Sequence, residues 1–202
     1  MRFPFFASFI VFCVWLGYEL HKRRNIESKA NDDFWQKEAE ANNTRRKSLD
    51  QLDYIQIPFQ KLPEAALPED PVVRECLDTL HELALAPIVN LTGISNTDLK
   101  LQYGAPNIDL LSQYDQRYTV LARTLQTWAN ALYEKGYVEE ARQVLEFAIE
   151  TRTDISASYK LLSAIYQQNG MTHKISDLIP VAESLNSPMK KHIVQYLSEL
   201  CG

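Results

Sequence analysis

Hydrophobic residues recur at intervals of three and four along most of the chain beyond residue 70, which places them on one face of a helix. The pattern predicts long helices over about 71–84, 115–135, 138–150, 156–168, 175–185 and 188–200. Shorter helices are predicted over about 96–103 and 106–111. Because no strand-rich region interrupts this pattern, we predict an all-α fold.

Residues of the kind that begin and end helices stand at several of these boundaries. Asp70 can accept hydrogen bonds from the free amides of the helix that follows, and Pro71 fits its first position. The stretch 95–98 resembles a capping box, and Gly104 is placed to end the short helix that this box begins. These signals support the helices over 71–84 and 96–103.

The stretch between residues 25 and 69 has a different pattern. Residues 25–43 are polar and charged, which is typical of a solvated helix or a linker beside a membrane. From Tyr54 to Phe59 apolar and polar residues alternate, while Pro58 and Pro63 disfavour a central strand. We expect an extended arm that lays its apolar side chains on the helical domain.

The first apolar segment has no polar face at all. Residues 3–18 contain no charged residue, and Leu20 with a snorkelling Lys22 extends their reach. This length predicts a single transmembrane helix in contact with the lipid bilayer through residues 3–20. A cleaved secretory signal is the alternative, but residues 17–21 make a poor cleavage site.

Charges beside this segment predict its orientation. Lys22, Arg23 and Arg24 outweigh Arg2 and the amino terminus, which places the bulk of the chain in the cytoplasm of a single-pass cell-membrane protein. The predicted organisation is a transmembrane anchor with a basic flank (1–24), a polar juxtamembrane helix or linker with an extended arm (25–69), and a helical domain (70–202).

Composition excludes several kinds of function. The net charge of −5 disfavours a nucleic-acid partner, which would call for a concentrated basic face. Cys13, Cys76 and Cys201 show neither a disulfide framework nor metal-ligand spacing, and no phosphate-cradling loop is present. We therefore predict no catalytic residue, no cofactor and no metal site.

An internal repeat is the most informative feature of the helical part. The residues around Gly136 match those around Gly170 in character, position by position, and we call the spacing between these two glycines the repeat period. The matched pairs are Leu125 with Tyr159, Trp128 with Leu162, Leu132 with Tyr166, Leu145 with Ile179 and Ala148 with Ala182. The spacing from Gly136 to Gly170 is the length typical of a helix-pair repeat, so it indicates a stack of helix pairs.

The chain here resembles the tetratricopeptide-repeat (TPR) family, with the better match over 132–148 and clearest units over 122–155 and 156–189. Ala129 and Ser163 take the place of the family's small residue in the first helix. The second unit departs from the pattern at Ile175, and Thr153 and Ser187 stand where the family has proline. The resemblance implies a TPR-like stack of antiparallel helix pairs behind the anchor.

The resemblance also implies a peptide-binding groove lined by the first helix of each unit. By that register the candidate groove residues are Arg123, Gln126, Asn130, Tyr133, Lys160 and Gln167. The family's carboxylate clamp is not reproduced. An ordinary solvated face is an equal alternative for these residues.

Three functions follow from these expectations. The preferred one is an adaptor without catalytic activity that binds a membrane-associated protein or peptide partner. The second is a structural subunit of a membrane complex whose groove is filled by its own arm or by another subunit. The third is an enzyme with an unfamiliar site, for which the sequence offers no convergent titratable groups.

Overall fold

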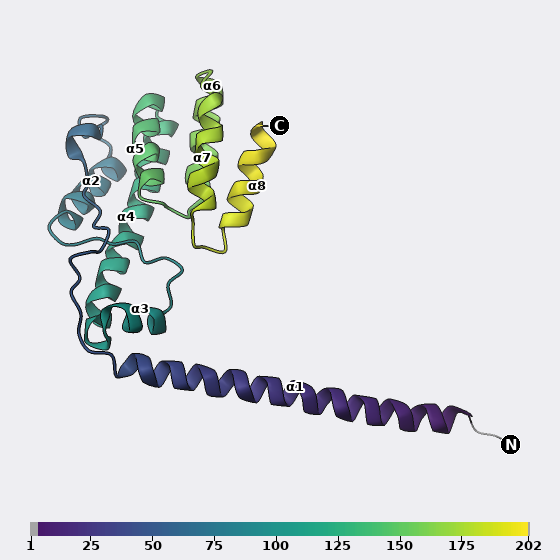
Figure 1. The fold of residues 1–202 in the computed structure, drawn as a ribbon. Helices are drawn as coiled ribbons and strands as arrows, with labels where there is room; N and C mark the ends of the chain where they lie inside the picture. The colour runs from purple at the N-terminus through teal and green to yellow at the C-terminus, as the bar shows by residue number, and fades with distance from the viewer. Residues whose placement is uncertain (1–3, 202) are drawn as a thin grey trace. The chain divides into compact units, whose positions relative to one another are not determined.

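The computed structural model describes the backbone of residues 4–201 and the side chains of residues 8–22 and 31–201 (Figure 1). Its helices are α1 (Pro4–Asn42), η1 (Phe59–Lys61), α2 (Pro71–Leu83), α3 (Asn96–Tyr103), η2 (Ala105–Asn107), α4 (Ile108–Glu134), α5 (Val138–Glu150), α6 (Ser156–Gln168), α7 (His173–Glu183) and α8 (Lys190–Cys201). Within these residues the β structure amounts to one isolated antiparallel bridge, between Tyr54 and Val89. The predicted all-α fold is confirmed.

The chain forms two compact units. Unit 1 comprises Met1–Lys47 and Asn96–Asn107, and unit 2 comprises Ser48–Ser95 and Ile108–Gly202. These units have other boundaries than the predicted parts, because α3 packs on α1. A helical pattern shows that a segment is amphipathic, but it does not show which neighbour covers the apolar face.

In unit 1, α1 continues without a break from Pro4 through the polar stretch to Asn42. No helix is long and apolar enough to cross a membrane among the residues whose side chains are described. The transmembrane helix predicted over 3–20 is therefore not confirmed, and its side chains at 3–7 lie outside the described residues.

Polar side chains join the last turns of α1 to α3. The ammonium of Lys37 lies 2.7 Å from the carboxylate of Asp98, and the hydroxyl of Thr97 donates to Glu38 at 2.6 Å. Lys100 forms an ion pair with Glu38, and the two side chains are less than a quarter exposed. The hydrogen bonds from Lys100 and Thr97 hold the pKa of Glu38 below its usual value.

The turn after α3 closes this unit. Gly104 has a φ of +95°, and a Cβ there would lie 2.2 Å from the carbonyl oxygen of Arg45. The Asn107 amide donates to the carbonyls of Lys47 and Tyr103 at 2.9 and 2.8 Å, and its oxygen accepts from Arg46. The glycine that was predicted to end the helix also permits this close approach.

Unit 2 begins with the arm. Leu52 and Leu62 are buried, and the N–H of Ile55 donates to the carbonyl of Ile88 at 2.9 Å. The ring of Phe59 stacks on His81 of α2 with centroids 4.3 Å apart. The arm's apolar side chains thus pack on the core of unit 2.

Several helices of unit 2 begin or end at the residues that the sequence predicted. Asp70 caps α2 by accepting from the N–H groups of Val72 and Val73, as predicted. Helices α5 and α6 have the predicted bounds. Helix α4 begins at Ile108, earlier than predicted, because Leu111 and Tyr114 extend its buried stripe.

Matched turns join α4 to α5 and α6 to α7. The N–H of Tyr137 donates to the carbonyl of Leu132 at 2.9 Å, and one repeat period later the N–H of Met171 donates to the carbonyl of Tyr166 at 2.7 Å. This bond, with a left-handed residue before it, defines the Schellman ending of a helix. The repeat seen in the sequence is therefore a repeat of backbone geometry at these two turns.

One core runs through unit 2. Each helix from α4 to α8 packs on the next in chain order, α2 packs on α4, and α6 also contacts α8 (Figure 1). The largest fully buried side chains are Trp128, Tyr159, Leu80, Ile88, Leu111, Leu121, Leu125, Leu132, Leu145, Leu162, Ile165 and Ile175. Four of the five matched repeat pairs are buried at both members; Ile179 of the fifth pair is partly buried. The repeat thus reflects packing.

Candidate functional site

The four candidate groove residues that lie on α4 differ in how far they are exposed. Arg123 and Asn130 are exposed, and Tyr133 is partly buried against the core. Gln126 is only 9% exposed, donating to Asn130 at 2.8 Å and accepting from the hydroxyl of Ser158 on α6. Gln126 was expected in an open groove, but it is instead buried and joins α4 to α6 through its hydrogen bond with Ser158.

The two candidates on α6 are exposed. The ammonium of Lys160 lies over the ring of Tyr196 on α8, 5.6 Å from its centroid. Gln167 lies two turns further along α6. We call these two residues, together with the exposed Arg123 and Asn130 of α4, the groove face.

A hollow of about 450 Å³ lies between α6 and α8 and includes Lys160. We call it the α6–α8 hollow. The hydroxyl of Ser156 is buried in its wall and has no hydrogen-bond partner among the described residues. Such a group is costly to bury, and a ligand that accepts its hydrogen bond would remove that cost. The hollow is lined by Ser156, Tyr159, Lys160, Met189, His192, Ile193, Gln195, Tyr196 and Glu199.

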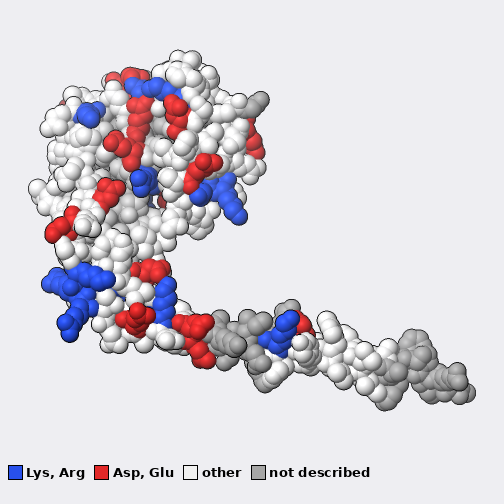
Figure 2. Space-filling view, in the orientation of Figure 1, with Lys and Arg blue, Asp and Glu red and all other residues white. Residues whose placement is uncertain are grey.

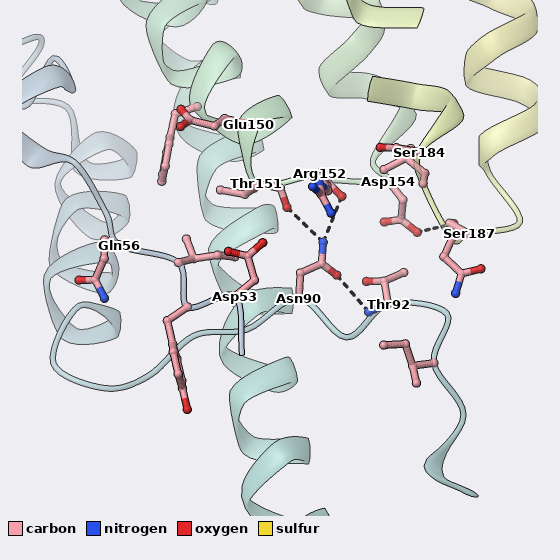
Figure 3. Close-up of a pocket in the computed structure, with 16 residues that line it drawn as sticks. Asp53, Gln56, Asn90, Thr92, Glu150, Thr151, Arg152, Asp154, Ser184 and Ser187 are labelled. Atoms are coloured by element: carbon pink, nitrogen blue, oxygen red, sulfur yellow. Dashed lines mark hydrogen bonds between the residues drawn. The ribbon is translucent and has the colours of Figure 1, made fainter. Parts of the chain in front are cut away.

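A second hollow, of about 470 Å³, lies where the loops of unit 2 meet (Figure 3). We call it the loop hollow. Four segments line it: 53–56 of the arm, the loop at 90–94, the α5–α6 connection with the end of α5 at 147–154, and the α7–α8 connection at 184–187. The amide of Asn90 holds two of them together by donating to the carbonyls of Thr151 and Arg152 at 3.1 and 3.2 Å.

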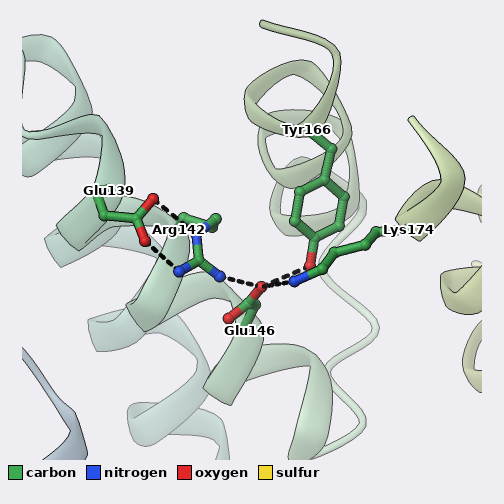
Figure 4. Close-up of polar contacts among 5 residues, drawn as sticks. All are labelled: Glu139, Arg142, Glu146, Tyr166 and Lys174. Carbon is green, nitrogen blue, oxygen red and sulfur yellow. Dashed lines mark hydrogen bonds and ion pairs between the residues drawn. The ribbon is translucent and has the colours of Figure 1, made fainter. Parts of the chain in front are cut away.

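A polar network joins α5 to α6 and α7 (Figure 4). Arg142 bonds both Glu139 and Glu146, and Glu146 also accepts from the hydroxyl of Tyr166 at 2.8 Å. Lys174 of α7 lies 3.6 Å from the same carboxylate. The Arg142 guanidinium lowers the pKa of Glu139, as expected for a paired surface carboxylate. The network fits a structural role because each of its charged side chains is paired with an opposite charge inside the network.

Burial keeps one thiol and two phenols of the core protonated. Burial raises the pKa of Cys76 to about 11, so this side chain is a thiol at neutral pH. Burial likewise raises the pKa values of Tyr118 and Tyr159 well above the usual range. Among the described residues no three His, Cys, Asp or Glu side chains gather to hold a metal ion.

Sequence reasoning missed both hollows. Tyr196 and Ser156 belong to the α6–α8 hollow, but the first was counted only as an apolar residue of the last helix. The loop hollow combines four distant segments, and no spacing in the sequence could have indicated it.

Comparisons of the chain with protein-family models, curated proteins and solved structures gave no match.

Proposed function

We propose that this protein is a membrane-anchored, TPR-like binding module without catalytic activity, and that its groove face binds an extended segment of a protein partner. The observation that carries the proposal is the pair of Schellman turns one repeat period apart, together with a hollow lined by successive first helices α6 and α8. Helix-pair stacks of this period commonly present such a face to a partner.

The chemistry of the groove face favours a segment with acidic side chains. Arg123 and Lys160 supply two exposed cations, and Asn130 supplies an exposed amide for hydrogen bonding. Tyr196 adds an aromatic surface beside Lys160. Charged hydrogen bonds to carboxylates would fix the register of such a segment, and the apolar wall of the hollow would take one of its side chains.

The charges of unit 2 on the face that Figure 2 shows give no reason to prefer a nucleic acid. On the face that Figure 2 shows, Lys and Arg side chains of unit 2 are interspersed with Asp and Glu. A basic region without acidic neighbours would be needed for strong phosphate binding. We therefore propose a protein partner.

The alternative is a structural subunit whose groove is filled by its own arm. Residues 53–56 of the arm line the loop hollow, and none of the arm's residues is among those that line the α6–α8 hollow. This arrangement favours the adaptor, because the arm does not fill the α6–α8 hollow.

The anchor is proposed from the sequence together with α1. Apolar side chains are exposed all around α1 and not on one face; they include Phe9, Ile10, Val11, Phe12, Val14, Trp15, Leu16, Tyr18 and Leu20. Lipid would cover such a helix on every side, whereas a protein groove would cover one face. The basic residues after the segment then favour a cytoplasmic location for both units.

Photocrosslinking in native membranes tests the groove directly. A benzophenone amino acid in place of Lys160 or Gln167 is expected to crosslink the same partner, because both positions lie on the groove face. The matched control is the same amino acid at Arg74, an exposed position on α2. Equal crosslinking from Arg74, or none from either position on α6, would contradict the proposal.

A further inference from the structure

The loop hollow carries an inference that goes beyond the groove face. It is a separate concavity, and no lining residue is shared with the α6–α8 hollow. We propose that the loop hollow is a second binding site, which takes an arginine side chain from a partner protein.

Apolar side chains form part of the lining of the loop hollow. Phe147 and Leu185 are 7% and 6% exposed, and Ile55 is partly buried beside them. Such a surface accepts the aliphatic stem of a long side chain while its charged end remains at the rim.

The rim is acidic. Asp53, Glu150 and Asp154 line the hollow, and Arg152 is the single cationic side chain among its lining residues (Figure 3). The Ser187 hydroxyl donates to one oxygen of Asp154 at 2.6 Å. The net charge of the lining is negative, so a second cation is attracted and an anion is repelled.

The shape of the hollow is already formed. The side-chain amide of Asn186 donates to the carbonyl of Gly93 at 2.8 Å, and a Cβ at Gly93 would lie 1.8 Å from the backbone oxygen of Asn186. Asn90 clamps the neighbouring turn through Thr151 and Arg152. A preformed site binds without the cost of ordering its loops.

An arginine fits these features better than the other basic side chain. The hollow offers carboxylates from separate segments, and a guanidinium presents five donors in a planar fork that can bond several acceptors at once. A lysine would place one compact charge and leave acceptors unpaired. An apolar side chain alone would remove the carboxylates from water without compensation.

The test uses the full chain, labelled with nitrogen-15 in detergent micelles, and N-acetyl-arginine methylamide as the probe. We expect saturable NMR shifts at residues 53–56, 90–94, 150–154 and 184–187. Asp53→Asn plus Glu150→Gln, both isosteric changes at exposed positions, should weaken binding at least about fivefold, since two charge-assisted bonds are lost. Arg152→Gln should strengthen it, because the competing cation is gone.

The double variant should weaken binding of the probe and Arg152→Gln should strengthen it. These opposite effects distinguish a binding site from a general loss of structure. Glu82→Gln, which removes an exposed carboxylate of α2 away from the hollow, should leave the dissociation constant unchanged. The same shifts with N-acetyl-norleucine methylamide would mean that the hollow recognises only an apolar stem. That result, absent shifts with the arginine probe, or equal binding by the double variant would overturn the proposal.

Discussion

Gly170 repeats the backbone conformation of Gly136 one repeat period further along the chain, with φ values of +69° and +87°. Both residues are surrounded by open space, so the conformation and not a close contact requires glycine there. The two turns fix how α4 meets α5 and how α6 meets α7. The stability of unit 2 should therefore depend on the left-handed backbone conformation of these two residues.

Replacing Gly136 with alanine should destabilise the protein by about 1 kcal/mol, because an L side chain is strained at this φ. A thermal melt would show a lower midpoint. The reverse change, Arg152→Gly, is the matched control: Arg152 has a φ of +60°, so glycine should relieve strain and raise the midpoint. An unchanged midpoint for Gly136→Ala would contradict the Schellman assignment.

Ala148→Trp tests the packing between paired helices. Ala148 is fully buried on α5, so a large side chain should overpack the core and lower the free energy of unfolding by roughly 1–3 kcal/mol or more. Urea denaturation would measure the change. Ala164→Trp on the exposed face of α6 serves as the control and should stay within about 0.5 kcal/mol of wild type. Equal effects of both changes would argue against this helix pair.

Acid should loosen the contact between α1 and α3. Lys100 and Thr97 lower the pKa of Glu38 below its unfolded value of 4.5. The contribution of Glu38 is therefore fully present well above pH 4.5 and is lost as the pH falls through its lower, folded pKa. NMR shifts of the α3 amides would follow the loss.

The control for the acid effect is Glu38→Gln, which cannot titrate. Its α3 amide shifts should no longer change over this pH range with the amplitude seen in the wild type. A transition of the same size in the variant would show that another group, such as Asp98 beside Lys37, is responsible.

Removing residues 1–18 tests the proposed anchor. The truncated protein should appear in the soluble fraction of lysed cells, since the apolar segment that would contact lipid is gone. Carbonate extraction and flotation would measure the partition of both forms. A truncated protein that still floats with membranes would show that another part of the chain holds it there.

Sequence reasoning predicted local structure well where a residue has one physical role. Asp70 caps α2 and Gly136 ends α4 because few other residues can do either. It failed where residues far away in the sequence determine the burial or the partner of a side chain. Gln126 was predicted to lie in an open groove, yet it is buried and accepts a hydrogen bond from Ser158 of α6. The pairing of α3 with α1 likewise depends on ion pairs between residues that are far apart in the sequence.

The central claim is that the groove face binds a protein partner. The most direct measurement is quantitative affinity capture from detergent-solubilised native membranes, comparing wild type with Arg123→Glu plus Lys160→Glu. Both substituted residues are exposed, so the fold should be kept, which a thermal melt would verify. The control is Lys61→Glu plus Arg74→Glu, which makes the same charge change on η1 of the arm and on α2.

The account predicts a partner that is captured by the wild type and by the control but is reduced at least about tenfold with the groove variant, as expected for the loss of two charged contacts. A partner captured equally by all three proteins would contradict a binding role for the groove face.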